Sequence, residues 1–186
     1  TPTAMNREHC VLGASRCVAV NPSDTAPALM ALDAQMVVRN GSGERVVDAA
    51  AFFVGPEVDI ERMPVLEPGD LLTAVRIPST WAGARFYFEK SRDRQVWDFA
   101  LGSVASAAKV RDGVIEDIRV VVNGMAPTPV RLTAVEDEVR GQAITDSLAE
   151  QAGQIAIRGV KPLAHNGYKV SLLKNLVTRS IRGAPA

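Results

Sequence analysis

Two short polar side chains, Ser23 and Asp24, stand in a turn directly before an apolar stretch that predicts a helix. Such side chains accept hydrogen bonds from the first N–H groups of a helix, and the N–H groups left open favour phosphate or other anions. A carboxylate repels phosphate, so Asp24 is better suited to sugar-type hydroxyls. Phosphate on the amides and hydroxyls on Asp24 would together describe a nucleotide cofactor. The alternative is a structural cap and nothing more, because such caps begin most helices.

Other chemical motifs are absent from the sequence. It contains no G-x-G-x-x-G, no G-x-x-x-x-G-K-[ST] and no G-x-S-x-G. Cys10 and Cys17 are the only cysteines, and their spacing matches neither a CxxC metal site nor a disulfide framework. His9 and His165 are the only histidines, and neither has a partner in a recognisable triad. We therefore expect no metal and no catalytic side chain, and we interpret these four residues as structural.

Composition limits the class of protein. The chain has 186 residues, of which 47% are hydrophobic, so it can bury a core of one domain or two small ones. Its 21 basic and 21 acidic residues cancel, which argues against a nucleic-acid or anionic-membrane partner. No apolar run approaches the roughly 20 residues of a membrane span, and no targeting signal is present. We expect a cytoplasmic or periplasmic protein without a membrane span.

The first part of the chain mixes strands with short helices and ends in a change of pattern around residues 79–83. Asn40-Gly41-Ser42-Gly43 is a polar, glycine-rich turn that predicts a hairpin. Three prolines between residues 56 and 68 indicate a loop. The expected strands are 9–13, 16–20, 35–39, 44–47 and 71–77, and the expected helices are 23–33 and the single turn 49–53.

The second part predicts antiparallel strands followed by helices. Asp112-Gly113 is the strongest hairpin signal, and it joins strands over 99–111 and 114–123, next to an aromatic strand over 85–90. Helical periodicity follows over 131–140, 146–158 and 168–182, each with a glycine where a C-cap would stand. In the last helix, the apolar residues share one face and the other carries Lys169, Lys174, Arg179 and Arg182.

These patterns predict an α+β fold in two domains. Residues 1–80 would form an α/β lobe, and residues 81–186 a three-stranded antiparallel sheet packed on a three-helix bundle.

Several segments, in order, resemble the FAD-binding subunit of molybdenum hydroxylases, the family of xanthine dehydrogenase, aldehyde oxidoreductase and carbon monoxide dehydrogenase medium subunits. The resemblance covers roughly residues 6 to 183. The segments that carry it are CVAVNPSD (17–24), LEPGDLL (66–72), FEK (88–90) with DFA (98–100), NGMAPTPVR (123–131) and YKVSLL (168–173) with Arg179. NREHCVLG (6–13) is most similar to the bacterial xanthine and aldehyde oxidoreductase type. By this resemblance residues 1–80 are the C-terminal lobe of a two-part FAD-binding domain.

The same resemblance implies FAD as cofactor and two partners, a molybdopterin-binding large subunit and an iron–sulfur small subunit. The family's N-terminal lobe, whose glycine-rich loop wraps the FAD pyrophosphate, has no counterpart here, and the chain starts at Thr1. We therefore expect that lobe to be missing and this segment alone to bind FAD poorly. Some relatives hold an iron–sulfur cluster with four upstream cysteines, but Cys10 and Cys17 do not match those ligands.

The resemblance also implies roles for individual residues. Small residues at Gly13 and Ser15 would let the backbone approach FAD, and Asp24 would hold ribityl or ribose hydroxyls. Lys90 would place positive charge near the flavin ring, unless it is a solvated lysine at a strand end. Trp97 would be either a lid over the ring or a core anchor. The full expected set is Gly13, Ser15, Ser23, Asp24, Leu71, Leu72, Lys90 and Trp97, with Leu71 or Leu72 packed on the ring.

Two functions follow as hypotheses. In the first, the chain passes electrons from iron–sulfur clusters on a partner, through FAD, to an external acceptor, while substrate oxidation takes place on the molybdopterin subunit. In the second, the same fold is a non-catalytic assembly domain that docks to a partner without a functional flavin. The colour of the purified protein distinguishes them, because bound flavin is yellow.

Overall fold

The computed structural model describes residues 3–183 as two antiparallel sheets and five helices. The smaller sheet has the order β2-β1-β3 and the larger one β4-β5-β6-β7. The strands of the smaller sheet are β1 (Gln35–Asn40), β2 (Gly43–Asp48) and β3 (Leu71–Arg76). Those of the larger sheet are β4 (Arg85–Ser91), β5 (Gly102–Arg111), β6 (Val114–Asn123) and β7 (Val130–Arg131). The helices are α1 (Ala26–Ala31), α2 (Ala49–Phe52), α3 (Thr133–Val139), α4 (Asp146–Ala156) and α5 (Tyr168–Arg182), with a 3-10 turn η1 at Ser79–Trp81.

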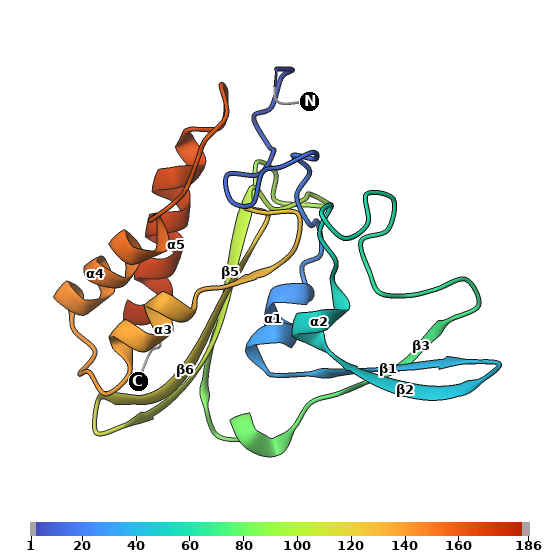
Figure 1. Cartoon of the computed structure of the whole chain (residues 1–186). Coiled ribbons are helices and arrows are strands. Elements are labelled where there is room, and N and C mark those ends of the chain that lie inside the picture. The colour runs from blue at the N-terminus through green and yellow to red at the C-terminus, as the bar shows by residue number, and fades with distance from the viewer. Residues whose placement is uncertain (1–2, 184–186) are drawn as a thin grey trace.

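The larger sheet lies in the middle of the molecule, with α3, α4 and α5 on one face and α1 with the smaller sheet on the other (Figure 1). Successive side chains of a strand point to opposite faces, so Val104 and Val122 pack with the helices while Ala105 and Val121 pack with α1. Because both faces are covered, residues that point to opposite faces are buried side by side, as in Val104–Ala105 of β5 and Val120–Val122 of β6. The α+β expectation is confirmed.

The hairpin that builds this sheet is local in origin. Asp112 and Gly113 have φ values of 51° and 76°. Two consecutive positive φ values are the signature of the tight turn that Asp-Gly favours, because its twist matches that of the strands. The predicted junction between β5 and β6 is therefore confirmed. The sheet has one strand more than predicted, the two-residue β7 beside β6.

A buried tryptophan joins the two sheets. Trp81, 1% exposed, lies in η1 between β3 and β4. Its indole Nε1 donates to Asp33 Oδ2 at 2.8 Å, and the cationic groups of Arg119 and Lys109 lie 5.1 and 5.5 Å from its ring centre. Cations over an indole face are attracted to it, the more so when desolvated. These contacts fix the connection between the smaller sheet and the face of the larger one.

The N-terminal segment differs from the prediction. Residues 9–13 and 16–20 are loops rather than strands, although the Cys10 N–H donates to the Val18 carbonyl at 2.9 Å. The N–H groups of Val11 and Leu12 instead donate to the Met125 carbonyl, at 2.9 and 3.0 Å. A distant turn thus satisfies the backbone that a ladder between the two segments would have paired.

Two helical predictions also need correction. Helix α1 covers only Ala26–Ala31, and Asp33, with a φ of 49°, takes the chain out of it. Lys169 was expected on the solvent face of α5, but it is 0% exposed. Its ammonium donates to the Glu8 carbonyl at 2.7 Å and the Gly124 carbonyl at 2.8 Å. The bounds of α5 agree with the prediction. Gly141 and Gly159 have the left-handed φ of a C-cap, whereas Gly183 does not.

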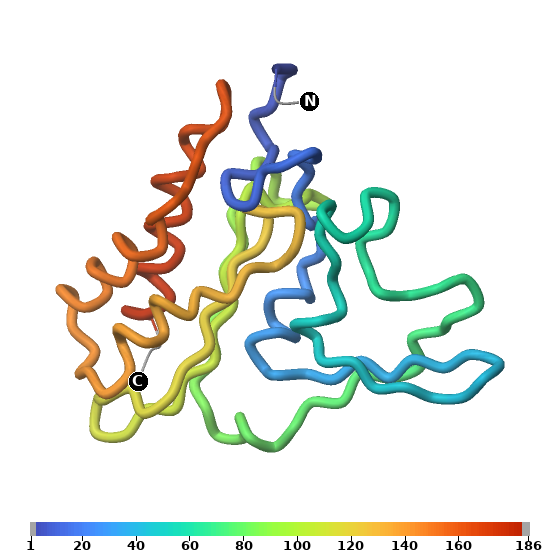
Figure 2. The backbone as a smooth tube through the Cα atoms, in the orientation of Figure 1, coloured from blue at the N-terminus to red at the C-terminus, as the bar shows by residue number. Residues whose placement is uncertain are grey.

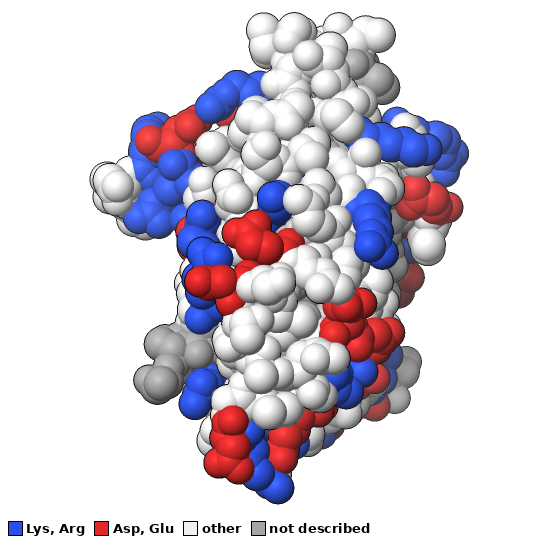
Figure 3. Space-filling model, turned by 90° about the vertical axis from the view of Figure 1, so that its left-hand side faces the viewer, with Lys and Arg blue, Asp and Glu red and all other residues white. Residues whose placement is uncertain are grey.

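The face formed by the C-terminal helices carries charges of both signs, interspersed with uncharged surface (Figure 3). Several of these charges pair, including Arg179 with Glu89 at 2.7 Å and Arg182 with Asp146 at 2.7 Å. Among the helices of residues 3–183, none has the length and apolar character needed to cross a membrane.

Candidate functional site

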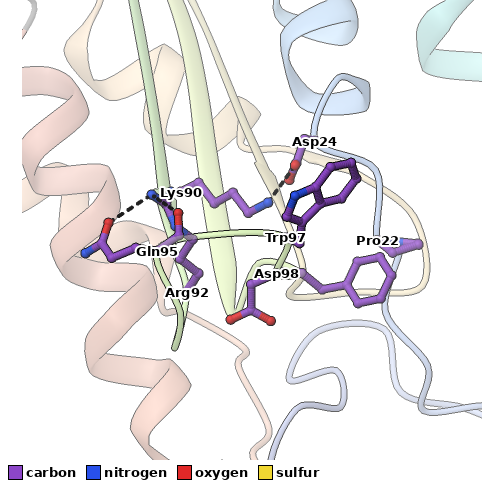
Figure 4. A pocket seen from close by; sticks show the side chains of 8 residues that line it. Pro22, Asp24, Lys90, Arg92, Gln95, Trp97 and Asp98 are labelled. Atoms are coloured by element: carbon purple, nitrogen blue, oxygen red, sulfur yellow. Dashed lines mark hydrogen bonds and ion pairs between the residues drawn. The ribbon is translucent and has the colours of Figure 1, made fainter.

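An open cleft of about 500 Å³ lies where the loop before α1 meets the end of β4 (Figure 4). This volume is within the range of small-molecule sites. Residues from both halves of the chain line it. They are Pro22 and Asp24 from the loop, and Lys90, Arg92, Gln95, Trp97, Asp98 and Phe99 from β4 and the segment after it.

An ion pair bridges the cleft. Lys90 Nζ lies 2.6 Å from Asp24 Oδ2, and Figure 4 shows the two side chains pointing at each other. The Lys90 side chain is 14% exposed and that of Asp24 49% exposed, so the lysine is the less hydrated partner. In its partly buried position, the ammonium depends on Asp24 for compensation. The more exposed carboxylate still faces the cleft, where it can accept further hydrogen bonds.

The segment after β4 holds its shape by arginine–aspartate pairs. The Arg94 N–H donates to Asp98 Oδ2 at 2.8 Å, and this bond, with the Arg94 guanidinium, keeps the pKa of Asp98 below its usual range. Arg7 makes a two-pronged contact with Asp93 at 2.8 and 3.1 Å, which likewise lowers the pKa of Asp93. The segment is therefore tied both to itself and to the N-terminal loop.

Trp97 belongs to this segment, and its side chain is exposed at the cleft. Its φ is 47°, in the left-handed region where a bulky residue is strained, and it is 97% exposed. The alternative that Trp97 is a core anchor is therefore wrong. A flat aromatic face at the mouth of the cleft can stack on a planar ligand.

Of the two residues expected to cap α1, only Ser23 bonds to an N–H at its start, and the N-cap position itself is Thr25. Ser23 Oγ accepts from the Ala26 N–H at 3.2 Å, whereas the Asp24 carboxylate is taken by Lys90. Because Ser23 occupies that amide and α1 has six residues, the amide-on-phosphate interpretation receives no support from the geometry. The role of Asp24 as an acceptor for hydroxyl groups stays a prediction.

Gly13 and Ser15 lie on the neighbouring N-terminal loop. Gly13 has a φ of 62° and comes close to Pro127 in the turn region after β6. Ser15 hydrogen-bonds the Glu57 carboxylate, which lowers the pKa of Glu57. Both residues are exposed, and neither lines the cleft.

Leu71 and Leu72 lie elsewhere. They begin β3 at the edge of the smaller sheet and do not line the cleft. Figure 2 shows this strand well apart from the blue N-terminal loops that precede α1. Leu71 is 69% exposed, so its surface is free for a contact, and its flavin role stays a prediction.

Sequence reasoning missed the residues beneath the ion pair. Lys90, Ser103 and Asn123 are register partners across β4, β5 and β6, so their side chains rise from the same face of the sheet. Ser103 and Asn123 are buried. The available sequence signal for Asn123 was a polar residue directly after the apolar run VVV. The strand register, which the sequence pattern does not give, places Asn123 in line with Lys90, the partner of Asp24.

The cleft fits part of a dinucleotide cofactor such as FAD. Asp24 could accept hydrogen bonds from sugar hydroxyls, Lys90 could place a positive charge and Trp97 an aromatic face against such a ligand. Within residues 3–183, no group of three His, Cys, Asp or Glu side chains is arranged to hold a metal ion. Cys10 is buried, Cys17 is half-buried, and both are free.

Two family models match the chain. One is described as the FAD binding domain in molybdopterin dehydrogenase and matches residues 6–80, and the other as the CO dehydrogenase flavoprotein C-terminal domain and matches residues 86–184.

Individual relatives agree with these matches. The aldehyde oxidoreductase FAD-binding subunit PaoB of Escherichia coli is 33% identical over 97% of this chain and 54% of its own. The glyceraldehyde dehydrogenase medium chain of Sulfolobus acidocaldarius is 31% identical over 86% of this chain and 56% of its own. A structure of carbon monoxide dehydrogenase from Hydrogenophaga pseudoflava is 26% identical, with a TM-score of 0.77 over 88% of this chain and 56% of that one. The chain spans about half the length of the relatives it matches.

Proposed function

The chain belongs to the CO dehydrogenase flavoprotein family, and from this membership we propose that it is the FAD-binding part of a molybdenum hydroxylase-type oxidoreductase. In this proposal it receives electrons from iron–sulfur clusters on a small partner subunit and passes them to an external acceptor. Substrate oxidation belongs to a molybdopterin-binding large subunit. FAD supplies the redox group, and this chain supplies the groups that hold and tune it.

The observation that carries the proposal is the Asp24–Lys90 pair in the cleft. Asp24 comes from residues 1–80 and Lys90 from residues 81–186, which we propose as two domains that contribute jointly to the site. Asp24 would accept hydrogen bonds from ribityl or ribose hydroxyls. Lys90 would orient that carboxylate and place its own positive charge beside the flavin. Trp97 would cover the flavin ring. Gly13, Ser15 and Ser23 would line the approach.

We also propose that a further segment completes the site. Trp97 and Leu71, both assigned to the flavin ring, are 97% and 69% exposed. Apolar side chains that bind a ring are expected to be covered on binding, because small-molecule sites bury most of the ligand surface. A second FAD lobe in the full-length protein would supply this cover and the pyrophosphate contacts. Residues 1–186 would then bind FAD weakly by themselves.

The absorption spectrum of the purified full-length protein tests the proposal. A flavin spectrum, with FAD released on denaturation, supports it. Colourless protein that cannot be loaded with FAD would favour the alternative, an assembly domain without a functional flavin.

Replacement of Asp24 tests the site within the full-length protein. Asp24→Ala removes the acceptor for cofactor hydroxyls, so FAD binding should weaken by roughly 1.5–3 kcal/mol. The melting temperature should also fall, because Lys90 loses the carboxylate that compensates its partly buried ammonium. The bond from the Ala26 N–H to Ser23 Oγ at the start of α1 does not involve Asp24. Asp146→Ala is a matched control, since Asp146 is another aspartate near the start of a helix that pairs with a basic side chain, Arg182. Equal FAD affinity in the two variants would remove Asp24 from the site.

A further inference from the structure

The loop that carries Asp24 is held from below by a single side chain of the larger sheet. Asn123, the last residue of β6, is 2% exposed. Its Nδ2 donates to Asn21 Oδ1 at 3.1 Å and to the Ser23 carbonyl at 2.7 Å. Both donors of one amide are therefore used on the residues directly before Asp24.

These bonds belong to a network that fixes the whole loop. Asn21 Oδ1 also accepts from the Ser23 N–H at 3.0 Å, and the Asn21 N–H donates to the Ala126 carbonyl at 3.0 Å. Asn21 is itself buried. The loop thus has little freedom as long as Asn123 presents N–H groups to it, and Asp24 follows at a set position.

The turn after Asn123 also holds the other N-terminal loop. The Met125 carbonyl accepts from Val11 and Leu12, directly before Gly13. The Gly124 carbonyl accepts from buried Lys169. Gly124 has a φ of 72°, and a Cβ there would lie 3.2 Å from the Ala100 carbonyl oxygen, so only glycine fits this turn well. Residues 123–126 are therefore a common support for both loops (Figure 2).

The orientation of the Asn123 amide is determined by its neighbours. Asn21 Oδ1 and the Ser23 carbonyl are both acceptors here. A flipped amide would place Asn123 Oδ1 against these two oxygens, which is unfavourable. Within residues 3–183, Asn123 Oδ1 has no hydrogen-bond partner, and neither has the adjacent Ser103 Oγ. An unpaired buried oxygen costs free energy, so the two bonds from Nδ2 must outweigh this cost.

We propose that Asn123 is a positioning residue for the cofactor site, through which the C-terminal sheet sets the loop that carries Asp24. The inference rests on the proposed FAD function. It extends that function, because the buried Asn123 amide, which lies outside the cleft, determines the position of the Asp24 carboxylate that would bind hydroxyls.

The decisive variant is Asn123→Asp, which preserves shape but replaces two donors with acceptors. A carboxylate would face Asn21 Oδ1 and the Ser23 carbonyl, so the loop should be displaced and FAD affinity should fall by on the order of a hundredfold at pH 8. A protonated carboxyl can again donate to the Ser23 carbonyl. Affinity should therefore recover partly on going from pH 8 to pH 5.5, which a defect of packing alone would not show.

Two further proteins make the result interpretable. Ser103→Ala removes a buried hydroxyl without a hydrogen-bond partner from the same row, so FAD affinity should stay within about twofold of the unmodified protein. Asn123→Ala removes both donors without introducing repulsion, so its FAD affinity should be about tenfold lower than that of the unmodified protein at every pH. It also serves if Asn123→Asp does not fold. The charged groups next to these positions, Lys90 of the row and its partner Asp24 in the loop, are the same in all these proteins.

FAD dissociation constants, measured by fluorescence titration of the full-length proteins at pH 5.5 and 8, give the outcome. If the unmodified protein binds no FAD, the proposed function fails. If it binds FAD and both Asn123 variants bind it equally well at both pH values, the proposed function stands and the positioning role of Asn123 is overturned. A pH-independent loss in Asn123→Asp that equals the loss in Asn123→Ala would also overturn it.

Discussion

Lys169 shows what burial does to a single charge. Its ammonium lies inside the protein on two backbone carbonyls, from Glu8 and Gly124. Carbonyl dipoles compensate a full charge only in part, and desolvation lowers the pKa of Lys169 to about 8. The residue thus joins α5 to the N-terminal loop and to the turn after β6, at a cost in stability while it is charged.

This cost predicts an alkaline stability window. The pKa of Lys169 is lower in the folded state, about 8, than its ordinary value of 10.5, so between these values the unfolded chain binds more protons. The Lys169 contribution to the free energy of unfolding should therefore rise with pH across that window, by up to about 3 kcal/mol. Lys169→Met lacks this contribution.

Urea unfolding of both proteins at pH 7.5 and 9.5 checks the prediction. The free energy of unfolding of the unmodified protein, relative to that of Lys169→Met, should be larger at pH 9.5 than at pH 7.5. Parallel pH dependence of the two proteins would show that Lys169 does not titrate in this range.

Lys90 is a residue whose charge should be visible in redox chemistry. Lys90→Met leaves Asp24 unpaired beside the proposed flavin position, so the reduced state, which carries the added electrons, becomes less favourable. The midpoint potential should fall, because one charge at contact distance is worth a few kcal/mol at a protein-like dielectric.

A redox titration of the full-length protein measures this potential. Lys161→Met, the same exchange at an exposed position, is the control and should leave the potential unchanged. An unchanged potential in Lys90→Met, at full FAD occupancy, would place the ammonium away from the ring.

At the scale of elements, α4 and α5 approach closely at one glycine. A Cβ on Gly153 would overlap the Thr178 hydroxyl and lie 2.9 Å from the Lys174 carbonyl oxygen. The absence of a side chain at this point therefore sets the separation of the two helices. Their apolar faces, with Ile155 from α4 and Leu173 and Val177 from α5, form the core beside the larger sheet.

Gly153→Ala should destabilise the protein despite the better helix propensity of alanine. Alanine gains about 1 kcal/mol as a helix former, but overpacking of a tight contact costs about 1–3 kcal/mol. We expect a net loss of about 1 kcal/mol in a urea titration. Gln154→Ala, at the next and exposed position of α4, should change stability by less than about 0.5 kcal/mol. A stabilised Gly153→Ala protein would show that the helices can move apart freely.

At the scale of the whole molecule, the two halves of the chain share one sheet. Ala105 and Val121 belong to the larger sheet, yet they pack in the same cluster as Met30 and Met36 from the first half. Trp81 reinforces this connection through Asp33 and Arg119. The proposed domains should therefore unfold together.

The two tryptophans make this testable. Trp97 is 97% exposed, so Trp97→Phe should leave stability unchanged and make buried Trp81 the only indole emitter. Thermal unfolding followed by Trp81 fluorescence and by far-UV circular dichroism should give midpoints within about 2 °C. Separate midpoints would mean that the two halves unfold independently.

The sequence by itself determined the features that depend on neighbouring residues. Asp112-Gly113 specifies its turn because both residues tolerate positive φ, and the periodicity of residues 168–182 specifies α5 because its apolar face repeats with the helical turn. The family resemblance is likewise a property of the sequence, and the matches to residues 6–80 and 86–184 confirm it.

Only the tertiary structure decided which distant groups meet. Asp24 and Lys90 are 66 positions apart, and Asn21 and Asn123 are 102 apart, so no local pattern pairs them. The N-terminal segments were predicted as strands from their apolar character, but the N–H groups of Val11 and Leu12 donate to the carbonyl of Met125 instead. Lys169 is buried for the same reason. A backbone or side-chain polar group takes whichever partner the packed chain brings within reach, and that partner is set by the fold of the whole molecule.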